Sequence, residues 1–231
     1  MRQIFVDSRD RSSGTSSDFS MALPQTLSLA SGSQGRIDDL RLPNAIPTIS
    51  DANNKIEVLM NGNYSQRTMQ NGNCSTGNEL ANKINSALVT ISGGWYVGYD
   101  TTTLAVTITC SNEFTFTGGT FMQQLLNRPY VRPDNRSYIF QYVPLQGLDI
   151  CYLCCPNFSH ADNVGPKHAS DVLCAIPITV GYGAVQHYSM SNSVFINLPA
   201  VTTQQLSFQL RDRDYNIVNS YANISFTLTI D

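Results

Sequence analysis

The chain has 231 residues, of which 42% are hydrophobic and 13% charged, and its formal net charge is −3 at neutral pH. A chain of this length buries roughly 70% of its unfolded surface and needs no disulfide or metal to hold a core. The low charge, with no basic stripe, disfavours a duplex-binding protein. No apolar run approaches the ~18 residues of a membrane-spanning helix. The N-terminus lacks the apolar core of a signal peptide, so we expect a protein that is not secreted and has no membrane span.

The first 17 residues carry three arginines whose charge two aspartates nearly cancel. We assign residues 1–17 to an N-terminal arm, which either docks under a partner or is a loose terminus. The charged residues of this segment are Arg2, Arg9, Arg11, Asp7 and Asp10.

Strict alternation of apolar and polar residues predicts half-buried strands of antiparallel sheets. The clearest case is "NISFTLTID", which places Phe226, Leu228 and Ile230 on one face. Alternation of the same kind marks "LSFQLRD" and "LAVTITC". The other candidate strands are residues 18–23, 35–42, 138–143, 149–155, 172–178 and 193–197. About eight strands with long connections predict a mainly β fold, a single jelly-roll β-sandwich spanning residues 18–231.

A block at about residues 55–128 interrupts this pattern and predicts a small α/β insertion with two short helices. In "TGNELANKINSALV", Thr76 and Glu79 form a capping box. Leu80, Ile84, Ala87 and Leu88 then follow at helical spacing as a core stripe. "TFMQQLLNRP" predicts the second helix, with Thr120 and Gln123 repeating the box. Between the helices, "WYVGYDTTTLAVTIT" predicts a hairpin that turns at residues 100–103.

The segment "LDICYLCCPNFSH" concentrates cysteines and raises the question of a metal or redox site. As a strand it would direct Cys151, Leu153 and Cys155 to one face and Cys154 to the other. A zinc site needs its thiolates on one side of a tight turn, and no second ligand pair follows. We therefore interpret the cysteines as small apolar packing residues. Other residues that could complete a site are His160, His168 and Cys174.

No other motif selects a catalytic or cofactor site. The aspartates of "RIDDL" and "RDRDYN" suggest calcium, but neighbouring arginines favour Arg–Asp pairs at a subunit contact or a strand end. A glycine at 118 before a predicted helix could bind an anion, yet any helix start looks the same. We expect no enzyme, no metal and no cofactor. The residues weighed here are Asp38, Asp39, Asp212, Asp214, Gly118 and His187.

Several short segments, and their order along the chain, are similar to those of one protein family. They are "SSDFSMALPQTLSL", "RIDDLRLPNAIPTI", "NKIEVLMNGNYS", "TGNELANKINSAL", "VGYDTTTLAVTIT" and "LDICYLCCPNFS". The chain resembles the penton, or vertex minor capsid, proteins of icosahedral double-stranded DNA viruses with double-jelly-roll major capsid proteins. This group includes virophages, polinton-like elements and nucleocytoplasmic large DNA viruses. Cys154 or Cys155 stands where such strands often carry Arg, which favours packing over metal ligation.

The resemblance implies a structural protein of the virion, made in the host cytoplasm or nucleus. It implies a homopentamer at each five-fold vertex, in contact with trimers of the major capsid protein and possibly other minor capsid proteins. Two alternatives stay open. One is a receptor- or carbohydrate-binding attachment module, favoured by the loop tyrosines Tyr182, Tyr188 and Tyr215 but weakened by Trp95, which looks like part of a strand. The other is a metal- or thiol-dependent enzyme built around the cysteines.

Overall fold

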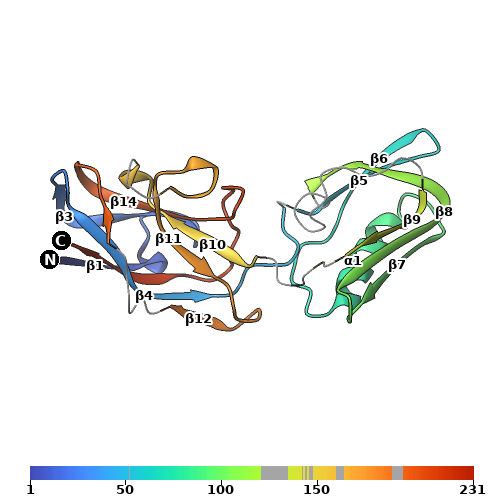
Figure 1. Ribbon diagram of the computed structural model, residues 1–231, viewed down its shortest axis with the longest axis horizontal. Helices are drawn as coiled ribbons and strands as arrows, with labels where there is room; N and C mark the ends of the chain where they lie inside the picture. Colours follow the sequence, from blue (N-terminus) through green and yellow to red (C-terminus); the bar gives the residue numbers. More distant parts are fainter. Residues whose placement is uncertain are drawn as a thin grey trace. The chain divides into compact units, whose positions relative to one another are not determined.

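The chain folds into two compact units, Met1–Ile46 with Leu148–Asp231, and Pro47–Gly147 (Figure 1). The structure is a computed structural model. It describes residues 1–51, 53–120, 135–141, 143, 145, 148–159, 164–188 and 195–231.

The first unit contains two antiparallel sheets that use segments from both ends of the chain. One sheet has the order β1-β15-β4-β12, with a short strand β13 also paired to β4. These strands are β1 (Arg2–Asp7), β15 (Ser225–Ile230), β4 (Gln34–Pro43), β12 (Val185–Tyr188) and β13 (Ile196–Asn197). The other sheet has the order β11-β10-β14-β3-β2. Its strands are β11 (Val172–Pro177), β10 (Ile150–Cys154), β14 (Val201–Arg211), β3 (Asp18–Leu29) and β2 (Ser13–Gly14).

The strand order is that of a jelly roll. If the two-residue strands β2 and β13 are left aside, eight strands remain among the described residues of this unit. Numbered along the chain, they form one sheet in the order 1-8-3-6 and a second in the order 5-4-7-2. Consecutive strands therefore alternate between the sheets, except in the 4-5 pair, as two nested Greek keys require. The predicted jelly-roll sandwich of about eight strands is confirmed.

The core of this unit lies between the two sheets. Phe226 and Leu228 of β15 point inward, as their alternation predicted, and both are buried. The ring of Phe208 in β14 lies 5.1 Å from that of Phe226 and 5.6 Å from that of Phe19, measured between centroids. Phe208 thus joins the two sheets, and burial of such rings provides much of the stabilising free energy. Three short 3-10 helices flank the strands: η1 (Ser8–Asp10), η2 (Pro156–Phe158) and η3 (Pro166–His168).

Within the described residues, the second unit consists of a sheet and the helix α1. The sheet has the order β6-β5-β8-β7, and β9 pairs with β8 as well. Its elements are β5 (Lys55–Met60), β6 (Asn63–Thr68), α1 (Gly77–Leu88), β7 (Trp95–Asp100), β8 (Ala105–Gly118) and β9 (Asn135–Phe140). The predicted hairpin is β7 and β8, paired from Trp95 with Cys110 to Asp100 with Ala105. Trp95 and Phe114 begin an aromatic cluster in this core, with ring centroids 4.5 Å apart.

Helix α1 forms as its capping box predicted. The Glu79 backbone N–H donates to Thr76 Oγ1 at 3.2 Å, and Glu79 Oε2 accepts from the Ser75 backbone N–H at 2.6 Å. These contacts satisfy amide groups that the first turn leaves without helical partners. The predicted stripe is buried against the unit's core: Leu80, Ile84, Ala87 and Leu88.

The structure differs from the expected domain boundaries at two places. Residues 2–7 of the expected arm form β1, which pairs along its whole length with the last strand, β15. The inserted unit begins at Pro47 and ends at Gly147, wider than the expected 55–128, because Ile49 and Val143 belong to its core. The second predicted helix, after Thr120, lies outside the described residues.

Candidate functional site

The cysteine-rich strand β10 packs as its alternation predicted. Cys151 and Leu153 point into the jelly-roll core, and Cys155, just after the strand, joins them. Cys174 of β11 lies opposite Leu153 in the antiparallel register and belongs to the same core. All four side chains are buried. These cysteines therefore occupy core positions of the kind that apolar side chains fill elsewhere in the sheet.

Burial keeps these sulfurs protonated. Loss of hydration raises the pKa of Cys151, Cys154 and Cys155 to about 12 each, and it also raises the pKa of Cys174. The thiolate, rather than the thiol, is the nucleophile and the metal ligand. At neutral pH these buried thiols are therefore poor nucleophiles in this conformation.

The histidines do not join the cysteines in the part of the chain that the structure describes. His168 and His187 are exposed, and His160 lies outside the described residues. Among the described residues, no three His, Cys, Asp or Glu side chains are grouped as a metal ion would require. That metal and cofactor are absent from the protein stays a prediction.

Cys154 faces the outer side of its sheet, yet it is fully buried. It lies near Tyr215, whose hydroxyl donates to Asp171 Oδ1. The guanidinium carbon of Arg211 stacks 4.2 Å from the centre of the Tyr215 ring. Burial, followed by the bond to Asp171, raises the pKa of Tyr215. The contacts of Tyr215 with Asp171 and Arg211 thus fix the loop after β14 over Cys154.

Among the described residues, the aspartates of the acidic runs make several contacts, one of which is an Arg–Asp pair. Asp38 Oδ2 accepts from Arg36 Nε at 3.1 Å and from the Thr229 hydroxyl at 2.8 Å. Asp212 instead accepts from the backbone and side chain of Asn216, and Asp214 lies 3.4 Å from Lys167 Nζ. Within the described residues of this chain, an Arg–Asp pair therefore forms in "RIDDL", whereas the aspartates of "RDRDYN" contact Asn216 and Lys167. Asp39 adopts a left-handed φ of 46° within β4.

The three tyrosines considered for sugar binding lie on different elements. Tyr215 has one ring face covered by Arg211 and its hydroxyl bound to Asp171. Tyr182 is exposed in the loop before β12, and Tyr188 is half-buried at the end of β12. Trp95 is buried in β7, as the strand pattern predicted.

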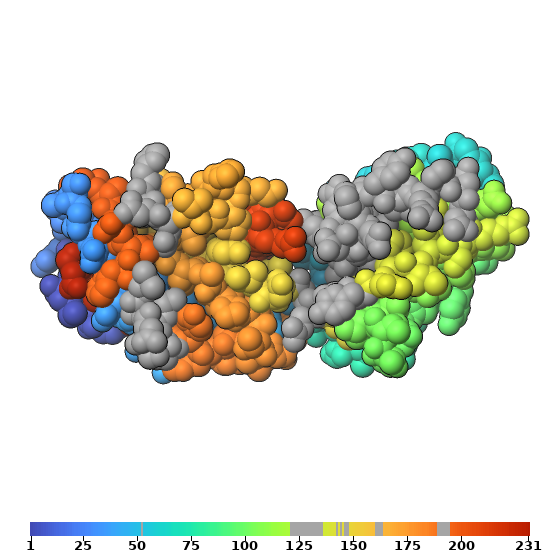
Figure 2. Space-filling view, viewed as in Figure 1, coloured from blue at the N-terminus to red at the C-terminus, as the bar shows by residue number. Residues whose placement is uncertain are grey.

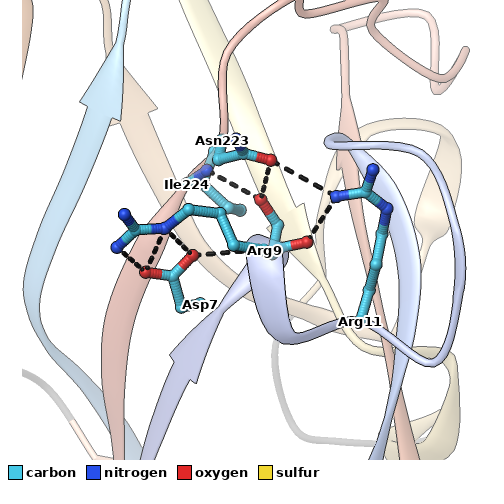
Figure 3. A network of polar contacts seen from close by, with 6 residues as sticks. Asp7, Arg9, Arg11, Asn223 and Ile224 are labelled. Carbon is cyan, nitrogen blue, oxygen red and sulfur yellow. Dashed lines mark hydrogen bonds and ion pairs between the residues drawn. The ribbon is translucent and has the colours of Figure 1, made fainter.

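A network of polar contacts joins the first strand to the last (Figure 3). The Ser8 hydroxyl donates to Asn223 Oδ1 at 3.1 Å and accepts from the Ile224 backbone N–H at 3.0 Å. Arg11 Nη1 donates to the Ser8 carbonyl oxygen at 2.7 Å. Arg9 binds both carboxylate oxygens of Asp7, which lowers the pKa of that carboxyl group. The expected arm is therefore tied into the sandwich and is not a loose terminus.

The sheet that contains β1 presents two different edges. Within the described residues, β1 pairs only with β15 and β12 pairs only with β4, so each has one open side. Phe5 of β1 is 74% exposed and Val185 of β12 is 56% exposed. Open edges that carry exposed apolar side chains are sites where another protein chain can pack. We call Phe5 with β1 and Val185 with β12 the edge surfaces.

No protein-family model matches the chain, and no curated protein sequence matches it significantly. Within the described residues, no helix is long and apolar enough to cross a membrane. The crystal structure of a mavirus penton protein, labelled with selenomethionine, aligns with 100% of this chain and 99% of its own, at 9% identity and a TM-score of 0.48. A score at this level establishes neither a common fold nor a common function.

Proposed function

We propose that this chain is a structural protein of an icosahedral virus capsid, a penton that forms homopentamers at the five-fold vertices. Its neighbours in the shell would be trimers of the major capsid protein. The strand order of the two sheets, 1-8-3-6 and 5-4-7-2, is the observation that carries the proposal, because capsid proteins are a principal use of the jelly roll. The sequence segments that resemble pentons support it and come from both units.

The edge surfaces support assembly into a closed ring. A ring needs a heterologous interface, in which one surface of each subunit meets a different surface of the next. The β1 and β12 edges are two such surfaces on one sheet, and both expose apolar side chains. A stable contact of this kind buries on the order of 800 Å² on each partner.

The mass of the purified protein in solution tests this proposal, measured by light scattering with and without a chelator. The chain mass is 25.4 kDa, so a pentamer would have five times that mass, about 127 kDa. We expect the pentamer to survive the chelator and Phe5→Asp to yield a monomer. Val164→Asp is the matched control, since Val164 is 77% exposed but lies in the loop that leads to β11.

Other masses would contradict the proposal in different ways. A stable trimer would contradict it and favour the attachment module. A monomer would contradict spontaneous ring closure, and co-assembly with purified major capsid protein would then test the vertex role. Loss of the oligomer on chelation would contradict the interpretation of the cysteines as packing residues.

A further inference from the structure

Cys154 is buried on a different side of its sheet from the other cysteines of the jelly roll. Cys151, Cys155 and Cys174 belong to the core between the two sheets, whereas Cys154 does not. It lies opposite Val172 of β11 in the antiparallel register, and the two residues are 0% and 6% exposed. The outer face of a sheet meets solvent unless another segment covers it. The burial of Cys154 and Val172 therefore depends on the segments that cross this face.

The loop after β14 covers Cys154. Tyr215, within residues 212–217, lies next to the Cys154 thiol, and its hydroxyl donates to Asp171 Oδ1, just before β11. Arg211 contacts the same tyrosine twice, because its guanidinium stacks on the ring and its Nη1 donates to the Tyr215 carbonyl oxygen. Since β10 lies between β14 and β11 in the sheet, these contacts carry the loop across the outer face of β10.

The segment of η3 covers Val172 beside this loop. A Cβ atom at Gly165 would overlap Val172 Cγ2, so the backbone of the segment rests directly on that side chain. Lys167 Nζ lies 3.4 Å from Asp214 Oδ1, and this ion pair joins the segment to the loop after β14. Figure 2 shows residues of both segments at the surface of the jelly-roll unit, those of η3 in orange and those of the loop in orange-red.

The loop after β14 has the features of a segment that opens by itself. Leu210 and Val218 at its two ends are buried in the core, whereas none of residues 211–217 is buried. Tyr215 and Lys167 adopt left-handed φ values of 68° and 55°, which strain residues that carry a side chain. Few buried apolar contacts and polar attachments are typical of segments with low local stability.

We infer that residues 212–217 form a lid that opens while the jelly roll stays folded, and that Cys154 is a modification site beneath it. Burial raises the pKa of the Cys154 thiol, so the reactive thiolate forms only when opening readmits water. The chemical class that it would take is a small disulfide. The thiolate attacks one sulfur, the S–S bond breaks, a mixed disulfide forms on Cys154 and the other half leaves as a thiolate.

The lid is tested by alkylating the folded full chain with iodoacetamide and mapping each cysteine by peptide mass spectrometry. We expect Cys154 to react at least about tenfold faster than Cys151 and Cys174, which become accessible only when the sandwich unfolds. The Cys154 rate should also rise less steeply with urea, because opening a loop exposes less surface than unfolding the unit. Equal rates with equal urea dependence would overturn the inference.

Tyr215→Phe tests which contact closes the lid. It removes the hydroxyl that donates to the Asp171 carboxylate, so the alkylation of Cys154 should become about tenfold faster. Tyr221→Phe is the matched control, since it removes the same group from a tyrosine that is 65% exposed outside the loop, and its Cys154 rate should equal that of the wild type.

Circular dichroism shows whether each variant is folded, and the comparison of Cys154 with Cys151 in the wild type needs no variant. A folded Tyr215→Phe protein whose Cys154 reacts at the wild-type rate would also overturn the inference. The lid goes beyond the proposed capsid role and does not depend on it.

Discussion

The two units of this chain hold their cores together in different ways. The inserted unit is one continuous segment, Pro47–Gly147, whose helix and hairpin form from neighbouring residues. The jelly roll is assembled from both ends of the chain, and its first strand pairs with its last, from Arg2 with Ile230 to Asp7 with Ser225. Closing a loop of that length costs conformational entropy that only the finished sandwich offsets. The comparison teaches that one continuous segment of the chain contains all the strands of the inserted sheet, whereas the jelly roll needs segments from both ends of the chain.

The single tryptophan makes this difference measurable. Trp95 is buried in the inserted unit, next to Phe114. Its fluorescence therefore reports that unit, while far-ultraviolet circular dichroism reports both. The predictions below separate the two signals.

Phe208→Ala should have the largest effect. Phe208 is fully buried and its ring contacts those of Phe19 and Phe226, so the cavity should cost about 4 kcal/mol of unfolding free energy. In urea, the circular dichroism of the jelly roll should be lost at lower denaturant, while the Trp95 fluorescence midpoint stays at its wild-type value. If both signals shift together, the two units unfold as one and the comparison fails.

Leu80→Ala should instead destabilise the inserted unit, by a somewhat smaller free energy. Leu80 is fully buried on the core face of α1, and its truncation should cost about 3 kcal/mol. The Trp95 fluorescence midpoint should fall while the jelly-roll transition persists. Val89→Ala, at the exposed C-terminal cap of the same helix, should change stability by less than about 0.5 kcal/mol. If both variants lost the same unfolding free energy, the view that the buried side chains stabilise this helix would be wrong.

Asp7→Asn should have the smallest effect, and that effect should depend on pH. Asp7 caps η1 by accepting the Arg9 backbone N–H, and asparagine can accept the same bond. The variant therefore keeps the cap, whose loss would cost about 1 kcal/mol, and loses only the exposed ion pair with the Arg9 guanidinium. The bonds from Arg9 lower the pKa of the Asp7 carboxyl below 3.8 in the folded chain. The stability it contributes is therefore present above about pH 4 and lost as the pH falls through the folded value.

The difference in unfolding free energy between wild type and Asp7→Asn should accordingly shrink toward zero in strong acid. Urea titrations at several pH values would measure it. Asp10→Asn, in the same short helix, is the control and should show a smaller difference at every pH. A difference that grows as the pH falls would contradict the proposed contact.

The elements that the sequence predicted well are those whose evidence is local. The Thr76 and Glu79 pair marked α1 because a capping box needs only residues within one turn. Phe226, Leu228 and Ile230 marked β15 because alternation is a property of the strand alone. The packing of Cys151 and Cys155 followed from the same alternation. No sequence signal identified β12, because its inward residue is Gln186, which accepts hydrogen bonds from Thr179.

The pattern of apolar residues along this chain was sufficient to predict the fold class and the helix α1. It also predicted on which side of β10 each cysteine lies. The tertiary structure alone decided that residues 2–7 are a strand, since Ile4 and Val6 are too few to show a period until β15 pairs with them. It alone placed Phe5 and Val185 on two different edges of one sheet. These features depend on which strands become neighbours, and long-range pairing is decided by the free energy of the whole sandwich rather than by any one segment.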